Sequence, residues 1–477
     1  MRIISAKIFL IIQLGMISLI SMAAEDLNVL CIIVDDLRPE LNCFGKTHII
    51  SPNIDQLASE GLCFNRAYCN IPVCGASRAS LMTGLRPTRS RFWDFRSRAD
   101  QDAPGVKVLP QLFKEHGYKT LSRGKVFHFS EDCQLAWDDV WDAPLKNSWR
   151  NYQLPKNVAK DQSTKTKFGP PFECADVADN AYVDGILAEK AISDLEDLKF
   201  SGEKFFLAVG FQKPHLPFNA PKKYWDLYNR ENIQLPEKND AAVGAPIQAY
   251  NGFYELRAYD GIPKQGSVDD DMAISLIHGY YAAVSYVDKQ IGNVLDKLKD
   301  LELDQNTLVI LFGDHGWSLN NHGNWCKHSN YDVALRTPLI IKLPNNQSNG
   351  KFTDSLVEFV DLYPTIAGLC NLPLPEHLEG KSMQPLLKDQ TAHFKDFIIA
   401  KWKHAITIKT DRYAYTEWSK DGELIDARML FDHTIDSGEY KNISEYRENK
   451  EILEQLQQTL HSNLGDSFHD HPDKWFK

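Results

Sequence analysis

Three long apolar runs along the chain each stop abruptly at ionisable residues. The runs are 27–34, 205–211 and 307–312, and they lead into Asp35-Asp36, Lys213-Pro214-His215 and Asp314-His315 respectively. Continuous apolar runs of this length are typical of strands buried on both faces of a parallel sheet. Because such sheets bind their ligands at the carboxyl ends of the strands, we expect these polar residues to meet in one site.

Segments with helical periodicity separate these strands. We expect helices over 52–60, from just beyond Cys74 to Gly84, over 109–116 and over 272–301, and a strand over 119–124 that leads into Lys125. Alternating helices and strands predict an α/β fold in which a large mixed, mostly parallel sheet lies between helices.

The pattern changes after about residue 390, where the strands become shorter and more polar. Strands are expected at 405–409 and 413–415, followed by a final helix around 445–464. We therefore predict a catalytic domain over 25–390 and a C-terminal subdomain over 391–477, with a small antiparallel sheet and a terminal helix. Two long insertions, 140–175 and 220–270, are expected to shape a substrate pocket.

The N-terminal residues resemble an export signal. Arg2 and Lys7 precede an apolar run over 8–20, and the small residues Ser21 and Ala23 follow it. This pattern predicts a signal peptide over 1–24, and the alternative is an N-terminal membrane anchor. Because the run is short for a bilayer, we expect no stable membrane insertion and an exported protein, periplasmic or secreted, or in a lysosome-like compartment.

Charge restricts the class of partner. The 477-residue chain has a net charge of −11, which argues against nucleic acid as a partner. Positive charge is concentrated in one short stretch that contains Arg78, Arg86, Arg89, Arg91, Arg96 and Arg98. Such a stretch would suit a small anionic group, and a solvated charged surface is the alternative for the arginines after Arg78.

Nine cysteines occur in the chain. Cys74 has a separate role, given below, and the remaining eight would be able to pair in an oxidising compartment. Cys31 lies inside an apolar strand and is expected to be a buried thiol. A disulfide between Cys133 and Cys174, which bracket a polar insertion, is the one pairing that we expect.

Three aspartates at the strand ends indicate a cation. Asp35, Asp36 and Asp314 would repel one another unless a positive ion lay between them, and carboxylate oxygens suit Ca²⁺ or Mg²⁺. The alternative for Asp35-Asp36 is that the pair only caps the next turn. The equivalent placement of Asp314-His315 favours the metal site.

Several short motifs together resemble one enzyme family. They are Val34-Asp35-Asp36, Cys74-Gly75-Ala76-Ser77-Arg78, Gly124-Lys125-Val126-Phe127-His128, Lys213-Pro214-His215 and Asp314-His315-Gly316-Trp317. In this order they resemble the signature blocks of the formylglycine-dependent, type I sulfatases, over about residues 27–370. Within that family the iduronate-2-sulfatase branch is the most similar.

The resemblance implies a fold, a modification and a metal. The fold would be an alkaline-phosphatase-like α/β sandwich. A sulfatase-maturation enzyme would convert Cys74 to formylglycine (3-oxoalanine), whose hydrated aldehyde offers two hydroxyls where a thiol offers none. One divalent ion would be held by Asp35, Asp36, Cys74, Asp314 and His315. Ca²⁺ is the expected ion and Mg²⁺ the alternative, because His315 stands where many relatives have asparagine.

The resemblance also assigns roles to the remaining motif residues. Arg78, Lys125 and Lys327 would neutralise charge on the transferring sulfuryl group. His215 would protonate the leaving alcohol and His128 would be the base for sulfate release, with the reverse order as the alternative.

The expected function is therefore an exported sulfatase that removes a sulfate ester from a carbohydrate. The substrate would be a fragment of a uronate-containing glycosaminoglycan or of an algal sulfated polysaccharide. A phosphatase or phosphonate hydrolase of the same superfamily is one alternative, although such enzymes usually use Ser or Thr as nucleophile. A catalytically inactive protein that binds sulfated glycans is another, which the intact Lys125, His215 and Asp314 disfavour.

Overall fold

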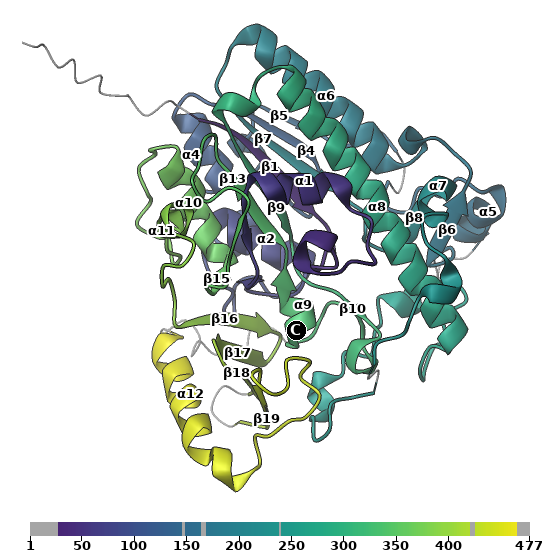
Figure 1. The fold of residues 1–477 in the computed structure, drawn as a ribbon, viewed down its shortest axis with the longest axis vertical. Coiled ribbons are helices and arrows are strands. Elements are labelled where there is room, and N and C mark those ends of the chain that lie inside the picture. The colour runs from purple at the N-terminus through teal and green to yellow at the C-terminus, as the bar shows by residue number, and fades with distance from the viewer. Residues whose placement is uncertain (1–26, 146–147, 164–167, 238–239, 420–424, 465–477) are drawn as a thin grey trace, which may run out of the picture.

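The computed structural model describes residues 27–145, 148–163, 168–237, 240–419 and 425–464. The predicted signal peptide over 1–24 lies outside the described residues. An eight-stranded sheet forms the centre of the molecule (Figure 1), in the order β14-β2-β13-β9-β1-β7-β4-β5. Its strands are β14 (Lys351–Thr353), β2 (Leu62–Phe64), β13 (Leu339–Lys342), β9 (Thr307–Gly313), β1 (Asn28–Val34), β7 (Phe205–Phe211), β4 (Lys119–Gly124) and β5 (Asp139–Trp141).

The three predicted apolar strands lie side by side in this sheet. Strand β1 pairs in parallel with β9 on one side and with β7 on the other, and β7 pairs in parallel with β4. Strands β1, β7 and β9 are buried along their whole length, which explains their nearly continuous apolar sequences. Their carboxyl ends therefore meet at one edge, as predicted.

Helices cover both faces of the sheet. One face packs against α2 (Cys74–Thr83), α4 (Leu109–Glu115) and α10 (Leu362–Leu369). The other packs against α1 (Pro52–Glu60), α6 (Val183–Ser201) and α8 (Asp270–Asp300), of which the last two are the long helices in Figure 1. Alternate residues of β1 enter the two cores, Cys31 on the first side and Ile32 on the second. The predicted α/β sandwich is confirmed.

A second, antiparallel sheet lies at the C-terminal end of the chain (Figure 1). Its strands are β16 (Phe397–Trp402), β17 (Ala405–Thr410), β18 (Tyr413–Trp418) and β19 (Ala427–Asp432), and α12 (Lys450–Asn463) packs on it. Sheet and helix agree with the predicted elements, although the helix begins a few residues later than expected. The division of the chain near residue 390 stays a prediction.

The smaller elements connect and extend these layers. Insertion 140–175 forms α5 (Pro155–Ser163) and β6 (Phe172–Ala175), and β6 pairs in parallel with β8 (Phe218–Pro221), which α7 (Lys222–Trp225) follows. The remaining short elements are β3 (Ala67–Tyr68), β10 (Ser318–Leu319), β11 (Trp325–Cys326), β12 (Arg336–Thr337), β15 (Val357–Glu358), α3 (Ala99–Asp102), α9 (Asp332–Leu335) and α11 (Gln384–Lys388). Among the described residues, no helix is both long enough and apolar enough to span a bilayer.

The predicted disulfide is wrong. Cys133 and Cys174 are both free thiols, as are the other seven cysteines. Cys133 packs against the core that holds α4, whereas Cys174 is exposed on β6, which pairs with β8 outside the central sheet. The two thiols therefore belong to different parts of the molecule.

Candidate active site

Four adjacent strands deliver the predicted site residues to one edge of the sheet. Asp35 and Asp36 follow β1, Asp314 follows β9, His215 comes shortly after β7, and Lys125 follows β4. Backbone hydrogen bonds continue past the strand ends. The amide of Asp35 donates to the carbonyl of Phe211 at 3.1 Å, and the amide of Asp314 donates to the carbonyl of Val34 at 3.2 Å. The ends of neighbouring strands are thereby held in register.

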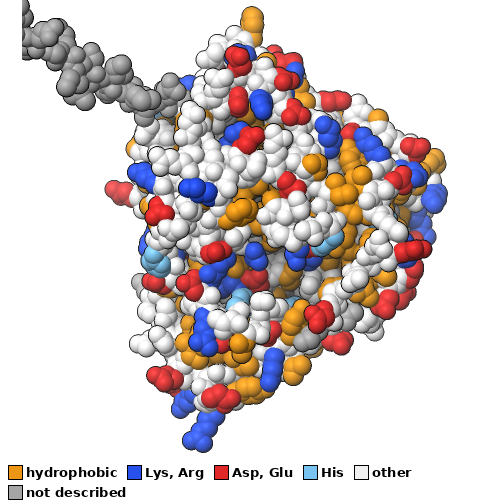
Figure 2. Space-filling view, in the orientation of Figure 1, with side chains coloured by type: hydrophobic (Ala, Val, Ile, Leu, Met, Phe, Trp, Pro, Cys, Tyr) orange, Lys and Arg blue, Asp and Glu red, His pale blue; other side chains and the backbone are white. Residues whose placement is uncertain are grey.

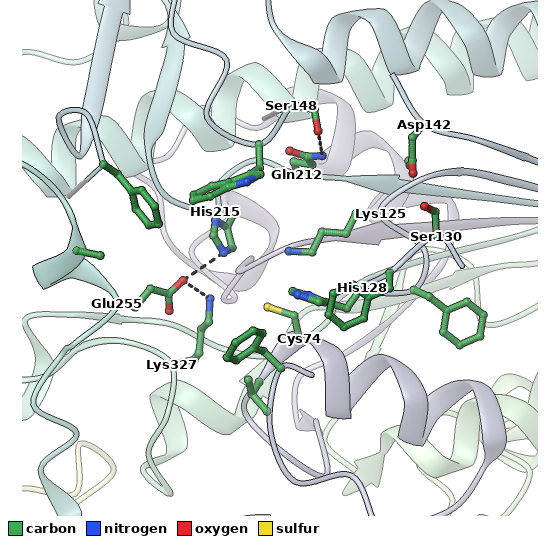
Figure 3. Close-up of a pocket in the computed structure, with 18 of the residues that line it drawn as sticks. Cys74, Lys125, His128, Ser130, Asp142, Ser148, Gln212, His215, Glu255 and Lys327 are labelled. Atoms are coloured by element: carbon green, nitrogen blue, oxygen red, sulfur yellow. Dashed lines mark hydrogen bonds and ion pairs between the residues drawn. The ribbon is translucent and has the colours of Figure 1, made fainter. Parts of the chain in front are cut away.

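Cys74 is the first residue of α2 and lies at the floor of this site (Figure 3). Its exposed fraction is only 2%. The next residue must be glycine, because a Cβ on Gly75 would lie 2.1 Å from the carbonyl oxygen of Phe95. The chain around Phe95 thus presses directly on the start of the helix. Burial, followed by the negative charge of Asp35, raises the pKa of the Cys74 thiol to about 12.

Donor atoms suited to a metal converge around Cys74. Asp35, Cys74, Asp314 and His315 offer atoms that all lie within 4.8 Å of one another, and a second such group contains Asp35, Asp36, Cys74 and His215. Nδ1 of His315 donates to the carbonyl of Gly316 at 2.9 Å, so its Nε2 faces the centre, 3.4 Å from Asp36. The donors fit one hard divalent ion, with imidazole as a softer member.

Arg78 connects the two carboxylates that flank this centre. Nε donates to Asp314 at 2.9 Å and a terminal nitrogen donates to Asp35 at 3.2 Å, while the other terminal nitrogen donates to the carbonyl of Val126 at 3.1 Å. The side chain is fully buried. A planar guanidinium is the side chain that can reach two carboxylates and a carbonyl at once. Arg78 therefore connects the residues that follow β1 and β9 from a buried position.

Two lysines bring further positive charge. Lys125 forms an ion pair with Asp35, and Lys327 donates to Asp36 at 3.0 Å. Burial alone would raise the pKa of Asp35, but Lys125, His215 and Arg78 hold that pKa well below its usual range. Burial keeps the pKa of Asp36 well above its usual range, in spite of Lys327.

A pocket of about 750 Å³ opens above Cys74 (Figure 3). Its walls include Lys125, His128, His215 and Lys327, together with aromatic side chains from the two insertions, Trp149, Phe168, Tyr254 and Tyr259. The space-filling view in Figure 2 shows basic, acidic and histidine side chains gathered near the middle of one hollowed face. A cavity of this size accommodates a sugar unit.

The two candidate proton-transfer residues differ in their surroundings. His215 lies beside the cluster, with Nε2 3.9 Å from Asp36. Burial and the charge of Lys327 lower its pKa. His128 contacts the rings of Phe95 and Phe129, and its Nδ1 has no hydrogen-bond partner among the described residues. Burial lowers the pKa of His128 to about 2, so its ring is neutral.

Sequence reasoning missed Glu255, whose carboxylate reaches the centre of the pocket (Figure 3). Oε1 lies 2.8 Å from Nζ of Lys327 and 3.2 Å from Nε2 of His215. Glu255 belongs to the 220–270 insertion and follows no apolar strand, so hydrophobic patterning carries no signal for it. His328, which also lines the pocket, was missed as well; its ring packs against those of Tyr254 and Trp402.

Four of the five arginines that follow Arg78 in this basic stretch form ion pairs with acidic side chains. Arg86 pairs with Glu358, Arg91 with Glu379, Arg96 with Asp94 and Arg98 with Glu131. Each of these side chains therefore has an acidic partner that the charge pattern alone does not reveal. Of the six arginines in this stretch, Arg78 is the one that contacts the strand-end carboxylates among the described residues.

Comparison with known proteins identifies the family. The family model described as Sulfatase matches residues 27–372, which include every strand of the central sheet. A second model, N-sulphoglucosamine sulphohydrolase, C-terminal, matches residues 320–465. The chain therefore belongs to the sulfatase family, and its enzyme class is that of the sulfuric ester hydrolases.

Two relatives illustrate the similarity within the family. The chain is 38% identical to iduronate 2-sulfatase of Mus musculus over 389 residues, which cover 74% of this chain and 70% of the relative. It is 30% identical to a sulfatase of Formosa agariphila over 458 residues, which cover 91% of this chain and 86% of the relative. The predicted likeness to the iduronate-2-sulfatase branch is confirmed.

Solved structures share the fold. One is a protein in complex with its substrate D-glucosamine-2-N,6-O-disulfate, with a TM-score of 0.78, 20% identity, and coverage of 94% of this chain and 100% of that one. Another is a phosphonate monoester hydrolase from Silicibacter pomeroyi, with a TM-score of 0.75, 20% identity, and coverage of 91% and 94%. At these identities the likeness establishes the alkaline-phosphatase-like α/β fold alone.

Proposed function

We propose that this chain is an exported enzyme that hydrolyses a sulfate ester on a carbohydrate, using a formylglycine made from Cys74 and one divalent metal ion. The observation that carries the proposal is the position of Cys74. Its sulfur lies 3.3 Å from Nε2 of His315, in a buried group of metal-donor atoms, at the floor of a pocket whose walls carry Lys125 and Lys327. A positively charged pocket floor suits the anionic sulfate group.

The residues present fit a bound cation. Carboxylate oxygens and an imidazole nitrogen converge in one buried cluster, and Arg78, Lys125 and Lys327 pair with its three carboxylates. Oxygen donors grouped in this way are the ligands that a hard divalent ion prefers. Asp35, Asp36, Asp314 and His315, with residue 74, would hold the ion, for which we propose Ca²⁺. A bound divalent ion offsets negative charge on the oxygens that it contacts, and a hydrated formylglycine supplies a hydroxyl nucleophile in place of a thiol.

Charge stabilisation and proton transfer are assigned to different residues of the chain. Lys125 and Lys327 place positive charge beside the oxygens of the sulfuryl group, while Arg78 is fully buried and acts by holding Asp35 and Asp314 in place. His215, protonated on both ring nitrogens, donates its Nε2 proton to the leaving alcohol and becomes neutral, with Nδ1 still bonded to the carbonyl of Leu216. His128 lines the same pocket, and its Nδ1 has no hydrogen-bond partner among the described residues; we assign to it the acceptance of the proton that must leave residue 74 when sulfate departs.

The proposed substrate is a sulfated sugar that carries or neighbours a uronic acid. Support comes from the relatives named iduronate 2-sulfatase and from an ulvan-active sulfatase of Formosa agariphila that is 25% identical over 469 residues. A pocket of about 750 Å³ favours one terminal sugar over the middle of a long chain. Export to the periplasm or cell exterior belongs to the proposal too, on the strength of the N-terminal sequence.

The test begins with mass spectrometry of the peptide that contains residue 74, from protein made in a host with active sulfatase maturation. Conversion to formylglycine lowers the mass by about 18 Da relative to the cysteine form. The matured protein is then assayed on sulfated mono- and disaccharides, with a phosphonate monoester as a second arm. Unmodified Cys74 in a host that converts a control sulfatase would refute the proposed nucleophile. Hydrolysis of the phosphonate alone would favour the phosphonate hydrolase instead.

A further inference from the structure

We propose that Glu255 is a positioning residue that holds His215 on the side of the pocket where the alcohol leaves. This inference rests on the proposed function, because it concerns the same pocket. The carboxylate contacts the ring of His215 and the ammonium of Lys327 at once (Figure 3), at 3.2 Å and 2.8 Å. It is largely buried, with a side-chain exposure of 19%.

The backbone that carries Glu255 is fixed to the loop that carries Lys327. The side-chain amide of Asn251 donates to the carbonyls of Trp325 at 2.9 Å and of Lys327 at 2.7 Å. The amide of Phe253 in turn donates to the side chain of Asn251 at 2.7 Å. Glu255 then begins a short helical turn over Leu256–Ala258, and the carbonyl of Ala258 accepts from the amide of Phe168 at 2.8 Å. These hydrogen bonds hold the backbone on both sides of Glu255 in place, so the position of its carboxylate is fixed.

His215 needs a partner on the pocket side of its ring. Nδ1 lies 2.5 Å from the carbonyl of its neighbour Leu216, and because a carbonyl only accepts, Nδ1 is the donor there. That bond fixes one edge of the ring. Nε2 is left facing the pocket, where Glu255 lies at 3.2 Å and Asp36 at 3.9 Å. Without Glu255, the ring would be free to turn toward Asp36 and away from the leaving group.

Lys327 depends on Glu255 much less. Its ammonium also contacts both carboxylate oxygens of Asp36, at 3.0 Å and 3.2 Å, and it packs over the ring of Trp317. Removal of Glu255 leaves those contacts in place. Removal of the Glu255 carboxylate should therefore impair proton transfer to the alcohol. It should leave the stabilisation of charge on the sulfuryl group by Lys327 largely unchanged.

The test compares substrates that do and do not need a proton on the leaving group. Matured Glu255→Gln is assayed on 4-nitrocatechol sulfate, a good leaving group, and on a sulfated sugar, whose alcohol is a poor one. We expect kcat on the sugar to fall by about 30-fold or more, and kcat on the aryl sulfate by less than about 3-fold. Asp260→Asn is the matched control, since this carboxylate lies in the same insertion but pairs with Lys160; both rates should stay unchanged.

A double-mutant cycle with His215→Gln separates positioning from a general structural effect. If Glu255 acts through His215, then Glu255→Gln should add less than about 2-fold to the loss that His215→Gln alone causes on the sugar. Equal losses on both substrates, or fully multiplicative losses in the cycle, would overturn the inference.

A crystallographic readout does not depend on turnover. Crystal structures of the wild type and Glu255→Gln should show the His215 ring displaced in the variant and unchanged in Asp260→Asn. An unmoved ring would refute the positioning role. If the wild type hydrolyses no sulfate ester at all, the proposed function fails, while the position of the ring still decides the role of Glu255.

Discussion

At the scale of single residues, the site depends on side chains whose shape matters as much as their charge. Arg78 is the clearest case, because one planar group serves Asp35, Asp314 and a backbone carbonyl while fully buried. A lysine at this position would keep the positive charge but would lose the fork that reaches both carboxylates. One buried carboxylate would then be left without its partner.

Arg78→Lys should therefore lower both stability and activity. We expect a loss of about 3 kcal/mol in the free energy of unfolding in metal-free protein, and a fall in kcat of about 100-fold or more. Urea unfolding and assays of the matured protein measure the two effects. Arg96→Lys is the control, since Arg96 is an exposed arginine that forms an ion pair with Asp94. Equal behaviour of the two variants would show that Arg78 does not hold the site together.

Asp35, Asp314 and Lys125 could be found in the sequence because each follows a predicted strand, and Cys74 because it lies at the start of a helix. Lys327 and His128 were assigned from the resemblance to the family. Glu255 and the aromatic wall at Trp149 and Phe168 could not be found in this way. They come from insertions, and their places are set by contacts with distant loops, such as the bonds from Asn251 to the Lys327 segment. Likewise, the acidic partners of Arg86 and Arg91 are Glu358 and Glu379, far away in sequence, so a local count of charge could not decide between an anion site and a paired charged surface.

At the scale of elements, strand ends fix the geometry of the site. Strands β4 and β7 come so close at their carboxyl ends that a Cβ on Gly210 would lie 2.0 Å from the carbonyl oxygen of Lys125. The amide of Lys125 donates to the carbonyl of Gly210 at 2.8 Å. The position of Lys125 at the end of β4 thus depends on a glycine, Gly210, in the adjacent strand β7.

Gly210→Ala should push these two strand ends apart. We expect a loss of about 3 kcal/mol in the free energy of unfolding, because the new methyl group meets backbone that has no room to yield. Activity should fall as well, since Lys125 moves with its strand. Thermal unfolding and kcat on an aryl sulfate report the two effects. A variant with the wild-type melting temperature and kcat would contradict the close approach.

The loop after β1 predicts a dependence of stability on pH. Glu40 is buried and pairs with Arg38 at 2.5 Å and His48 at 2.9 Å. Burial alone would raise its pKa, but Arg38 and His48 lower that pKa from 4.5 to about 2. The ionised Glu40 carboxylate therefore stabilises the fold above about pH 5, and this contribution to stability is lost as the pH falls toward 2. The shift corresponds to an effect on the order of 3 kcal/mol.

At pH 7 the free energy of unfolding of Glu40→Gln should be lower than that of the wild type by about 3 kcal/mol. The difference should shrink steadily as the pH falls from about 5 to 2. Urea unfolding across this range measures it. Glu203→Gln, at an exposed position, should follow the wild-type curve. A constant gap between Glu40→Gln and the wild type at all pH values would show that the lost contribution is packing and not charge.

Long elements were predicted well because their hydrophobic patterns are strong, as in β1, β7 and β9. Short strands such as β10 and β11 were not foreseen. Each has two residues, and its pairing is decided by the loops around the site and not by its own sequence. The terminal helix was predicted to begin near residue 445, whereas α12 begins at Lys450, after a turn that local propensity did not distinguish.

At the scale of the whole molecule, the C-terminal sheet is fastened to the central fold near the site. The amide of Lys401 donates to the carbonyl of Asn70 at 2.8 Å, and the side chain of Asn70 donates to the carbonyl of Ile399 at 2.9 Å. Ile398 and Ala400 enter the same core as α2. The strand β16 therefore completes a core that begins in the N-terminal half of the chain.

A chain truncated after residue 390 should consequently fail to fold, and the full chain should unfold in a single cooperative transition. Apolar residues of the main core would be exposed in the truncated form, so we expect it to aggregate on expression. Calorimetry of the full chain and the soluble yield of the truncation test this. A soluble, cooperatively folded 25–390 fragment would show that the two parts are independent domains.

Metal binding should stabilise the whole fold, because the proposed donors come from the ends of two central strands and the start of α2. At about 100 times the Kd, a bound ion adds about 2.7 kcal/mol to the free energy of unfolding. Thermal unfolding after chelation and after addition of Ca²⁺ or Mg²⁺ measures the gain and identifies the preferred ion. The gain should largely disappear in Asp314→Asn. No gain with either ion would contradict the proposed metal site.

The burial of Cys74 has a consequence for the order of events in biosynthesis. The residue lies at the floor of a narrow pocket with 2% of its surface exposed, and the chain at Phe95 presses on the residue beside it. A second protein large enough to carry out the proposed oxidation has no route to such a side chain once β1, β9 and α2 have come together. We therefore expect the proposed conversion to take place on the nascent or unfolded chain, so that a molecule which folded first would keep the thiol.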